Sequence, residues 1–412
     1  MFKRVPGTKD ILPSESSLWQ KIEEITRNTF RLYNFQEIRT PLIEEESLFN
    51  RSLGKATEIV QKQMFIIKNK EDNYCLRPEA TASVVRAYIE NNIDKTSTFS
   101  KFYYIGPMFR LERPQKGRLR QFHHIGCEVI GSSEPALDAE VISLADTLLR
   151  DFSISGYKIK INSLGCSLDK KRLGAILQKA LKEKLGKLCA NCKNRFKGNP
   201  LRILDCKNGP CREEIAGLDI RDEHLCQDCK DHFTKVKASL DSLNVSYENS
   251  PRLVRGLDYY TGTVFEISHD GLGAQDALGA GGRYNNLVKE LGGSDLGAIG
   301  FAFGVERLLL VQSPQATVRS NDLVYLISLG EEAKEEGIKI LNTLRKNNIA
   351  ADTDYEGKSL KGAMRLANDL KAKFVLIIGE DELKKGVVTL KNMRSGEQKE
   401  IKQDKLIEEL KC

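Results

Sequence analysis

The sequence predicts an α+β protein that carries a separate, smaller α/β domain at its C-terminal end. Residues 101–130 form two apolar, alternating segments joined by a loop with Pro and Gly, as in an antiparallel strand pair. In residues 168–240 lysines become frequent, cysteines cluster and the strand pattern fades, which predicts a mainly helical insertion. Residues 322–412 alternate apolar strands with amphipathic helices, which indicates a small parallel or mixed α/β domain.

Length and composition set broad limits on the class of protein. A chain of 412 residues is expected to form two or three domains. Its 40% hydrophobic and 29% charged content fits a soluble globular enzyme. No run of about 18 apolar residues occurs, so no membrane span is predicted. The opening MFKRVPGTKDILP lacks the apolar core of a signal peptide, which predicts a cytoplasmic protein.

The N-terminal part begins with a helix at Pro13, because proline favours the first helical turn and Leu18, Ile22 and Ile25 recur on one face. A strand is then expected over residues 35–42, and another strand is expected to end at residues 76–79. Apolar spacing predicts helices over 80–89 and 136–152 and a short strand over 158–161.

After the insertion, residues 252–267 return to strand character, and the Gly-rich residues 279–284 are expected to turn. Residues 297–303 predict a strand that leads into a helix over 305–311. The polar residues 312–321 contain proline and are expected to link two domains. Beyond them, strands are expected over 323–329, 349–353 and 374–378, with helices over 331–346 and 359–371.

The strand pair carries more chemistry than packing requires. Alternation along its second strand places Phe122, His124, Gly126 and Glu128 on one face, and the first strand ends at Arg110. Burying such polar groups costs free energy, so a strand pair that served only for packing would not collect them. The pattern predicts a site for a polyanion together with a small cationic ligand.

Charge is unevenly distributed along the chain. Residues 101–120 hold six Lys or Arg and one acidic residue, whereas residues 322–412 hold 17 of each sign. Contacts to a nucleic-acid backbone are therefore expected near the strand pair, and the C-terminal domain is expected to use shape and base contacts.

Four blocks, in this order, resemble the class II aminoacyl-tRNA synthetases and, within them, the histidyl-tRNA synthetase family. VPGTKDILP and RTPLIEEESLF resemble the family's opening and first motif, and FYYIGPMFRLERPQKGRLRQFHHIGCEVIG resembles its second motif. LVRGLDYYTGTVFEI resembles a block peculiar to the histidine enzymes, and GAIGFAFGVERLLL resembles the third motif. The resemblance covers essentially the whole chain.

This resemblance implies a class II antiparallel sheet flanked by helices, a mainly helical insertion and a C-terminal α/β anticodon-binding domain. The implied catalytic core covers residues 1–167 and 241–320, the insertion 168–240 and the anticodon-binding domain 321–412. The first motif implies a homodimer.

The implied activity is that of a histidine–tRNA ligase. Such an enzyme activates L-histidine with ATP and Mg²⁺ to histidyl-adenylate and pyrophosphate, then transfers the histidyl group to the 3′ end of tRNA(His). Three alternatives stand beside it: a silent synthetase-like subunit that regulates histidine biosynthesis, a sensor of uncharged tRNA, and a structural nucleotide-binding protein. The C-terminal domain argues against the regulatory subunit, and the absence of kinase motifs argues against the tRNA sensor. The LVRGLDYY block would have no purpose in a structural nucleotide-binding protein.

Two arginines carry the implied catalysis. Arg110 ends the first strand, where its planar fork can grip the α-phosphate and the amino-acid carboxylate. Arg255 approaches the α-phosphate in this family and does what a metal ion does in some relatives. The alternatives are a surface Arg110 paired with Glu112 and a purely structural Arg255.

The resemblance assigns further residues to ATP. Arg307 is implied to stack on adenine opposite Phe122, with Glu306 beside it, and Arg118 also belongs to the ATP site. Left open are an Arg307 that lies in solvent and a Phe122 that packs in the core.

Selection of histidine requires partners for an ammonium and for two ring nitrogens. The resemblance implies Glu79 and Thr81 for the ammonium, and Arg255 and His124 on the substrate face. Glu128, Tyr259 and Tyr260 are implied to line the ring pocket, where a phenylalanine substrate would leave their polar groups unpaired. A core role for Tyr259 is the alternative.

Three positions depart from the family pattern. His124 stands where the family usually has Gln, so activity is expected to become more pH-sensitive below about pH 6.5. Asn285 replaces the usual Asp, and Ala80 stands where Gly is common. None of these changes removes an essential charge.

The loop between the two strands is implied to meet the tRNA acceptor end, with its extra 5′ guanosine, through Gln115, Lys116 and Arg118. A solvated cationic loop is the alternative.

The ten cysteines are expected to be reduced thiols or metal ligands. Two CxxC pairs, Cys189-Cys192 and Cys226-Cys229, suggest one structural Zn²⁺ bound by all four thiolates, with His232 as another candidate ligand. The alternative is thiols that serve packing or lie at the surface.

Overall fold

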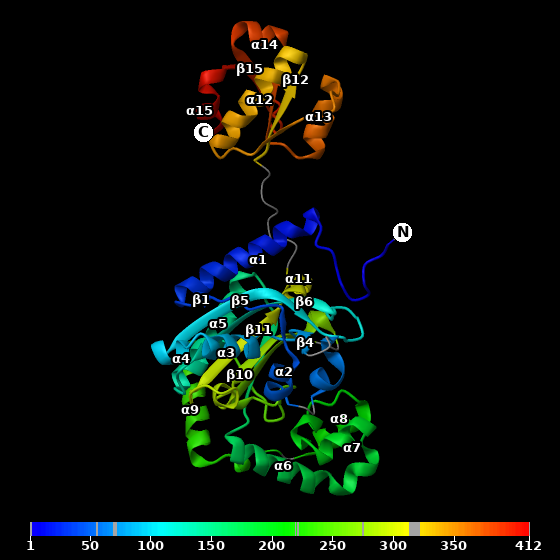
Figure 1. Cartoon of the computed structure of the whole chain (residues 1–412), viewed down its shortest axis with the longest axis vertical. Coiled ribbons are helices and arrows are strands. Elements are labelled where there is room, and N and C mark those ends of the chain that lie inside the picture. Colours follow the sequence, from blue (N-terminus) through cyan, green and yellow to red (C-terminus); the bar gives the residue numbers. More distant parts are fainter. Residues whose placement is uncertain are drawn as a thin grey trace. The chain divides into compact units, whose positions relative to one another are not determined.

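The computed structural model describes residues 2–54, 57–68, 72–218, 220, 222–273, 276–312 and 322–411. The chain divides into two compact units, Met1–Ala316 and Thr317–Cys412, both drawn in Figure 1. The predicted linker lies outside the described residues, apart from Gln312. In the described part of the chain, no helix has both the length and the apolar character needed to pass through a bilayer.

An eight-stranded sheet forms the centre of the N-terminal unit, with the strand order β1-β5-β6-β11-β10-β9-β7-β8. Its strands are antiparallel except at the two edges, where β1 pairs with β5 and β8 with β7 in parallel. This antiparallel-rich sheet with flanking helices confirms the predicted fold class. The strands are β1 (Gln36–Glu37), β5 (Ser100–Phe109), β6 (Gln121–Ile130), β7 (Tyr157–Ser163), β8 (Glu248–Asn249), β9 (Thr261–His269), β10 (Ala277–Arg283) and β11 (Ala298–Gly304).

Hydrophobic cores lie on both faces of this sheet, because side chains alternate along each strand. On β6, Ile125, Cys127 and Val129 enter one core, which they share with α1 (Pro13–Leu32), α5 (Pro135–Asp151) and α11 (Val305–Val311). Phe122 and Ile130 pack into the other core, together with α2 (Glu46–Ser52) and α3 (Thr81–Glu90). The alternation predicted for the second strand is therefore confirmed.

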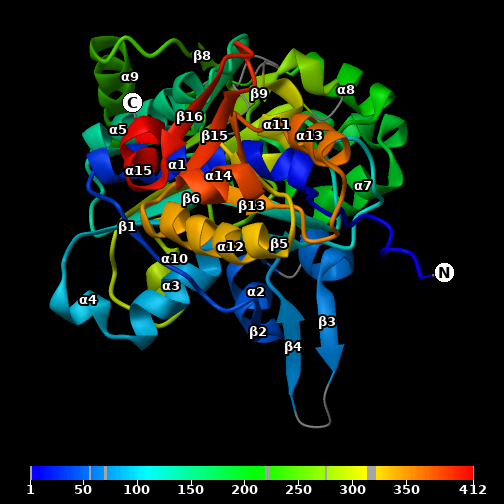
Figure 2. The same cartoon turned by 90° about the horizontal axis from the view of Figure 1, so that it is seen from above.

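A three-stranded sheet, ordered β2-β4-β3, lies beside the second core. Figure 2 shows β3 and β4 standing out from the rest of the N-terminal unit. The remaining elements of this part are β2 (Ile43–Glu45), the π-helical turn Ile59–Gln63, β3 (Phe65–Lys68), β4 (Asn73–Leu76), α4 (Ile93–Thr96) and α10 (Leu287–Glu290). The strand expected over residues 35–42 is thus reduced to β1, with β2 following it.

The insertion consists of helices in its described part. It contains α6 (Ser167–Leu181), α7 (Ala190–Lys197), α8 (Gly209–Ala216) and α9 (Gln227–Ser242), with short 3₁₀ turns between them. Figure 1 shows α6, α7 and α8 together at one end of the N-terminal unit. Their buried residues, among them Leu173, Leu177 and Ile215, belong to the same core as α3.

The prediction of a turn over residues 279–284 is wrong, because residues 277–283 form the central strand β10. Its glycines lie too close to neighbouring strands for any side chain. A Cβ at Gly281 would lie 2.3 Å from the carbonyl oxygen of Gly300, and one at Gly279 would lie 2.6 Å from that of Ala302. The glycines here permit close packing of backbones.

The strand predicted over residues 252–267 is wrong in its first half. The ladder of β9 begins at Thr261, and residues 252–260 are turns or irregular. Leu253, Val254, Tyr259 and Tyr260 are nevertheless buried in the second core. Their apolar character reflects burial as a loop, which alternation alone cannot distinguish from a strand.

The C-terminal unit is a mixed five-stranded sheet with the order β13-β12-β14-β15-β16. α12 packs into a core on one face and α13 into a core on the other. The strands β15 and β16 were not predicted. The elements are β12 (Val324–Ser328), α12 (Glu331–Lys346), β13 (Ala351–Thr353), α13 (Leu360–Asp369), β14 (Phe374–Ile378), α14 (Glu380–Lys385), β15 (Val387–Asn392), β16 (Gln398–Lys402) and α15 (Leu406–Lys411).

Candidate active site

A pocket of about 330 Å³ opens on the second-core side of the main sheet. Strands β6, β10 and β11 contribute to its lining, together with the segment before β9 and residues of the insertion. The structure brings the following predicted residues together around it: Glu79, Thr81, Arg110, Arg118, Phe122, His124, Glu128, Arg255, Tyr259, Tyr260, Glu306 and Arg307. Gln115 and Lys116 do not line it and lie exposed on the neighbouring loop.

Arg110 points into the pocket from the end of β5. Its Nε donates to the carbonyl oxygen of Pro78 over 2.9 Å, and its guanidinium lies 5.3 Å from the centre of the Phe122 ring. Glu112 forms its ion pair with Arg118, over 2.6 Å, so the alternative in which Glu112 pairs with Arg110 is wrong. Arg110 itself lines the pocket.

Arg255 also lines the pocket, from the segment before β9. Its Nη1 donates to Oε2 of Glu266 on β9 over 2.5 Å. Burial disfavours the charged form, but the attraction of Glu266, Tyr260 and Asp205 outweighs it and raises the pKa of Arg255 above its usual value. Its buried Nε has no hydrogen-bond partner among the described residues. A fixed cation with donors to spare therefore faces the pocket.

Arg307 and Glu306 begin α11 and have separate partners. Arg307 donates from Nε to the carbonyl oxygen of Gly117 over 2.8 Å and from Nη1 to that of Ala277 over 2.6 Å. Glu306 accepts from the backbone N–H of His123 over 3.0 Å and contacts its Nδ1 over 2.9 Å. The hydrogen bonds of Glu306 thus join α11 to β6, while Arg307 joins the strand-pair loop to β10.

Glu128 is the centre of a buried hydroxyl network. Its Oε1 accepts from Thr81 over 2.7 Å and from Tyr104 over 3.2 Å, and its Oε2 accepts from Tyr284 over 2.5 Å. Burial raises the pKa of Glu128 to about 8, against the opposing effect of these hydroxyl donors. The carboxyl group can therefore respond to a cationic ligand by changing its protonation state.

Glu79 occupies the N-terminus of α3. Its carboxylate accepts from the backbone N–H groups of Thr81 over 2.7 Å and Ala82 over 3.0 Å. Burial raises the pKa of Glu79, and these two hydrogen bonds oppose that effect. The neighbouring rings of Tyr259 and Tyr260 have centroids 4.7 Å apart. Carboxyl groups and phenols thus surround one small space.

His124 lies beside Phe122 on β6 and also lines the pocket. Its ring centroid is 5.1 Å from that of Phe122, and its buried Nδ1 has no partner among the described residues. Burial, followed by repulsion from Arg110 and Arg307, lowers the pKa of His124 well below its usual value. The imidazole therefore stays neutral at pH 6.5, and the pH sensitivity of activity that was expected below about pH 6.5 should begin at a lower pH.

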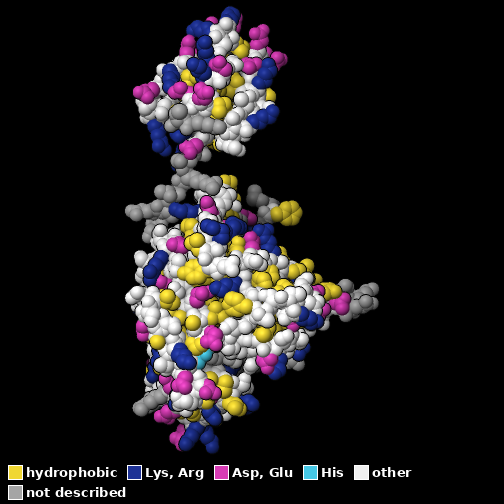
Figure 3. Space-filling model, turned by 90° about the vertical axis from the view of Figure 1, so that its left-hand side faces the viewer, with side chains coloured by type: hydrophobic (Ala, Val, Ile, Leu, Met, Phe, Trp, Pro, Cys, Tyr) yellow, Lys and Arg dark blue, Asp and Glu magenta, His cyan; other side chains and the backbone are white. Residues whose placement is uncertain are grey.

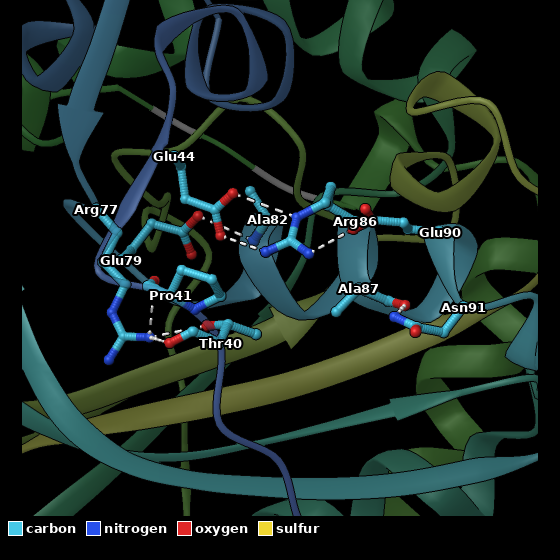
Figure 4. A network of polar contacts seen from close by, with 10 residues as sticks. All are labelled: Thr40, Pro41, Glu44, Arg77, Glu79, Ala82, Arg86, Ala87, Glu90 and Asn91. Carbon is cyan, nitrogen blue, oxygen red and sulfur yellow. Dashed lines mark hydrogen bonds and ion pairs between the residues drawn. The ribbon is translucent and has the colours of Figure 1, made fainter.

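A polar network fixes the segment that carries Glu79 (Figure 4). Arg77 donates to the backbone and side-chain oxygens of Thr40 over 3.0 and 2.8 Å. Arg86 on α3 pairs with Glu44 over 2.6 Å and with Glu90 over 2.8 Å. The RTPLIEEESLF block is thereby joined to α3, whose N-terminus holds the Glu79 carboxylate.

Several residues of the pocket were not predicted. Tyr104 and Tyr284 line the pocket and complete the Glu128 network. Tyr104 could have been found from the alternation on the first strand. The insertion adds Arg195, Arg202, Asp205 and Lys207 to the lining, and no local pattern in the sequence distinguishes these residues.

The single four-cysteine zinc set predicted from the two CxxC pairs is wrong. In the described residues, Cys189 and Cys192 lie with Cys206 and Cys211, whereas Cys226 and Cys229 lie with Cys166 and Asp169. Two separate groups therefore replace the predicted one. His232 belongs to neither, since its Nε2 contacts Asp138 over 2.9 Å.

Comparisons with known proteins agree with this geometry. Residues 7–308 match the family described as histidyl-tRNA synthetase, and residues 323–412 match the family described as anticodon binding domain. The chain is 46% identical over 409 residues to a histidine–tRNA ligase of Thermodesulfovibrio yellowstonii, covering 99% of this chain and 97% of that one. It is 45% identical over 412 residues to that of Thermosipho melanesiensis, covering 99% and 98%.

Solved structures agree as well. The crystal structure of apo Staphylococcus aureus histidyl-tRNA synthetase superposes with a TM-score of 0.84 at 36% identity, covering 100% of both chains. A Bacillus halodurans protein described as an ATP phosphoribosyltransferase regulatory subunit/histidyl-tRNA synthetase shares the fold at 23% identity, with a TM-score of 0.67 and coverage of 92% and 98%.

Proposed function

The chain belongs to the histidyl-tRNA synthetase family, and we propose that the pocket between Arg110 and Arg255 is where it activates histidine. The enzyme is a histidine–tRNA ligase. The observation that carries the pocket assignment is the pair of guanidiniums, which face one small space that also contains the buried carboxyl groups of Glu79 and Glu128. Cationic and acidic groups are thus arranged for an anion and an amino acid together.

In the first step, a carboxylate oxygen of histidine attacks the α-phosphorus of ATP, and the bond to the β-phosphate oxygen breaks, which gives histidyl-adenylate and pyrophosphate. ATP enters as its Mg²⁺ complex, with the ion held mainly by phosphate oxygens. Arg110 holds the carboxylate and the α-phosphate in line, and Arg255 neutralises the charge that develops on the phosphate. No protein nucleophile takes part.

The adenine ring lies between Phe122 and Arg307 in this proposal, with Arg118 at the phosphates. The position of Arg307 supports this placement of adenine, because two backbone carbonyl oxygens hold its guanidinium in place. Glu306 acts as a positioning residue through His123.

Histidine is recognised by two sets of groups. Its ammonium binds Glu79 and Thr81, and its imidazole lies against Glu128, His124, Tyr259 and Tyr260. A hydrocarbon ring would leave the buried Nδ1 of His124, which has no partner among the described residues, still unpaired, which disfavours phenylalanine.

In the second step, the 3′ hydroxyl of the terminal adenosine of tRNA(His) attacks the carbonyl carbon of the histidyl group, and AMP leaves. We assign acceptor-end contacts to Gln115, Lys116 and Arg118, and anticodon contacts to the C-terminal unit. Figure 3 shows Lys and Arg side chains interspersed with acidic ones on the visible face of that unit, which fits recognition by shape and bases.

We further propose a homodimer and the domain divisions 1–167 with 241–320, 168–240 and 321–412. Exposed apolar residues at the first motif and on β3, namely Leu42, Ile43, Ile66 and Ile67, support a contact between two copies. A cytoplasmic location is proposed because the nine described cysteines are unpaired and the substrates occur there.

Aminoacylation of a tRNA(His) transcript with labelled histidine tests the proposal. Charging by the unmodified protein, lost in Arg110→Ala and in Arg255→Ala, is expected. Normal charging by both variants would refute the assignment of this pocket. A folded protein that charges no tRNA would instead favour the silent regulatory subunit, against which the C-terminal anticodon-binding match argues.

A further inference from the structure

We infer that the insertion holds two structural zinc ions, each in a site of its own. The first site consists of Cys189, Cys192, Cys206 and Cys211, and the second of Cys166, Asp169, Cys226 and Cys229. Neither set is needed for the chemistry proposed above, and both lie within the small helical insertion or at its beginning.

The spacing of the ligand atoms fits single ions. Within each group, one ligand atom from every residue lies within 4.8 Å of the others. In the first site, the sulfur atoms of Cys189 and Cys206 are 3.9 Å apart. Four thiolates at 2.3 Å from a tetrahedral Zn²⁺ are about 3.8 Å apart, whereas a disulfide requires about 2.05 Å.

Both sites are built on the first turns of helices. Cys189, Cys226 and Cys166 are the N-cap residues of α7, α9 and α6. Cys192, Cys229 and Asp169 follow three positions later on the same helices, so each CxxC or CxxD pair presents two ligands from one turn. The positive ends of these helix dipoles favour anionic ligands.

Outer contacts already orient several of the ligands. The backbone N–H of Cys189 donates to the sulfur of Cys211 over 3.2 Å. The carboxylate of Asp169 is fully buried and accepts from the backbone N–H groups of Cys166 over 3.3 Å and Cys226 over 3.1 Å. Carboxylate oxygens have lone pairs for both a hydrogen bond and a metal ion, and such supporting contacts are typical of metal ligands.

The two sites brace different parts of the insertion. The second site joins the start of α6 to the start of α9, and so fastens the beginning of the insertion to its last helix. The first site lies within the insertion, where Cys206 stands between Asp205 and Lys207, two residues of the pocket lining. Arg195, three residues after Cys192, pairs with Glu58 over 2.9 Å beside the same pocket.

Bound ions can stabilise an insertion that is built from short helices. The metal-binding free energy adds to the folding free energy where the unfolded chain has no preformed site. The described helices α7 and α8 have only eight residues each, which is short for helices without outside support.

Metal analysis of the full-length, untagged protein tests this inference. Protein from cells grown with added Zn²⁺ is expected to contain two zinc ions per chain. Cys192→Ser and Cys211→Ser should each lose the first ion only, and Cys229→Ser should lose the second only. Cys75→Ala, a buried cysteine of β4 outside both groups, should keep two.

Cobalt substitution of the unmodified protein keeps the test decisive if variants fail to fold. Two equivalents of Co²⁺ should give the visible bands of tetrahedral cobalt thiolate, and Zn²⁺ should remove them. Protein with neither bound zinc nor cobalt bands would overturn both sites. One ion that disappears in Cys192→Ser and persists in Cys229→Ser would overturn the second site, and the reverse pattern the first.

Because this inference uses no pocket residue as a ligand, its failure leaves the proposed activity untouched. Conversely, if the unmodified protein contained two zinc ions but charged no tRNA, only the proposed function would be contradicted.

Discussion

Arg255 donates from Nη1 to Oε2 of Glu266 over 2.5 Å, and this contact joins the irregular segment before β9 to the strand itself. The guanidinium is held by an acidic residue that also lines the pocket. A cation fixed in this way needs little reorganisation when negative charge develops on a phosphate.

Replacement of Arg255 by alanine should lower the rate of ATP–pyrophosphate exchange by about 10²- to 10³-fold, since it removes one fixed donor to the transition state. Circular dichroism should show an unchanged fold. Arg150→Ala, on an exposed arginine of α5 that pairs with Asp146, is the matched control and should retain activity. Near-normal exchange in Arg255→Ala would remove this residue from the phosphate.

Glu79→Gln should raise the KM for histidine by about 10- to 100-fold, the worth of one charge-assisted hydrogen bond, and leave the KM for ATP unchanged. Both carboxylate oxygens accept from the N-terminus of α3, and the amide NH2 cannot replace one of them, so thermal stability should also fall, by about 1–3 kcal/mol. Steady-state exchange kinetics measure both constants. Glu90→Gln, at the exposed end of the same helix, is the control, and equal rises in both constants would indicate general damage to the pocket instead.

The pH dependence of stability should change in Glu128→Gln. Burial raises the pKa of Glu128 from 4.5 to about 8, so the folded protein holds this proton more tightly than the unfolded chain does. The resulting stabilisation is complete below pH 4.5 and is lost as the pH rises to 8. Thermal unfolding of ligand-free protein should therefore depend less on pH in the variant across this window. Parallel profiles for both proteins would show that Glu128 titrates normally.

Gly281→Ala should destabilise the N-terminal unit by about 1–3 kcal/mol or more, because the new Cβ would lie 2.3 Å from the carbonyl oxygen of Gly300. Differential scanning calorimetry should show a lower Tm. Gly209→Ala is the control, since a Cβ there meets nothing within 4 Å. An unchanged Tm in Gly281→Ala would mean that β10 and β11 can separate at no cost.

Local periodicity was sufficient to predict the strand pair and the side of it that faces the pocket. The alternation of Phe122, His124 and Glu128 depends only on neighbouring residues, and so does the helix Val305–Val311. For β10 the same reasoning failed, because its glycines are required by contacts with β11 that lie outside the local sequence.

Long-range groupings could not be predicted from spacing. The CxxC pairs suggested a single site, but each pair lies beside residues from other turns, Cys206 and Cys211 for one and Cys166 and Asp169 for the other. The pocket residues Arg195 and Lys207 were missed for the same reason, since the insertion reaches the pocket only in the folded chain.

The most direct test of the account is ATP–pyrophosphate exchange without tRNA, with each amino acid offered in turn. Exchange that depends on histidine alone, and that is lost in Arg255→Ala, is the predicted result. If folded protein with Mg²⁺ showed no exchange with any of the amino acids, or exchanged equally well with histidine and phenylalanine, the proposed activity would be contradicted.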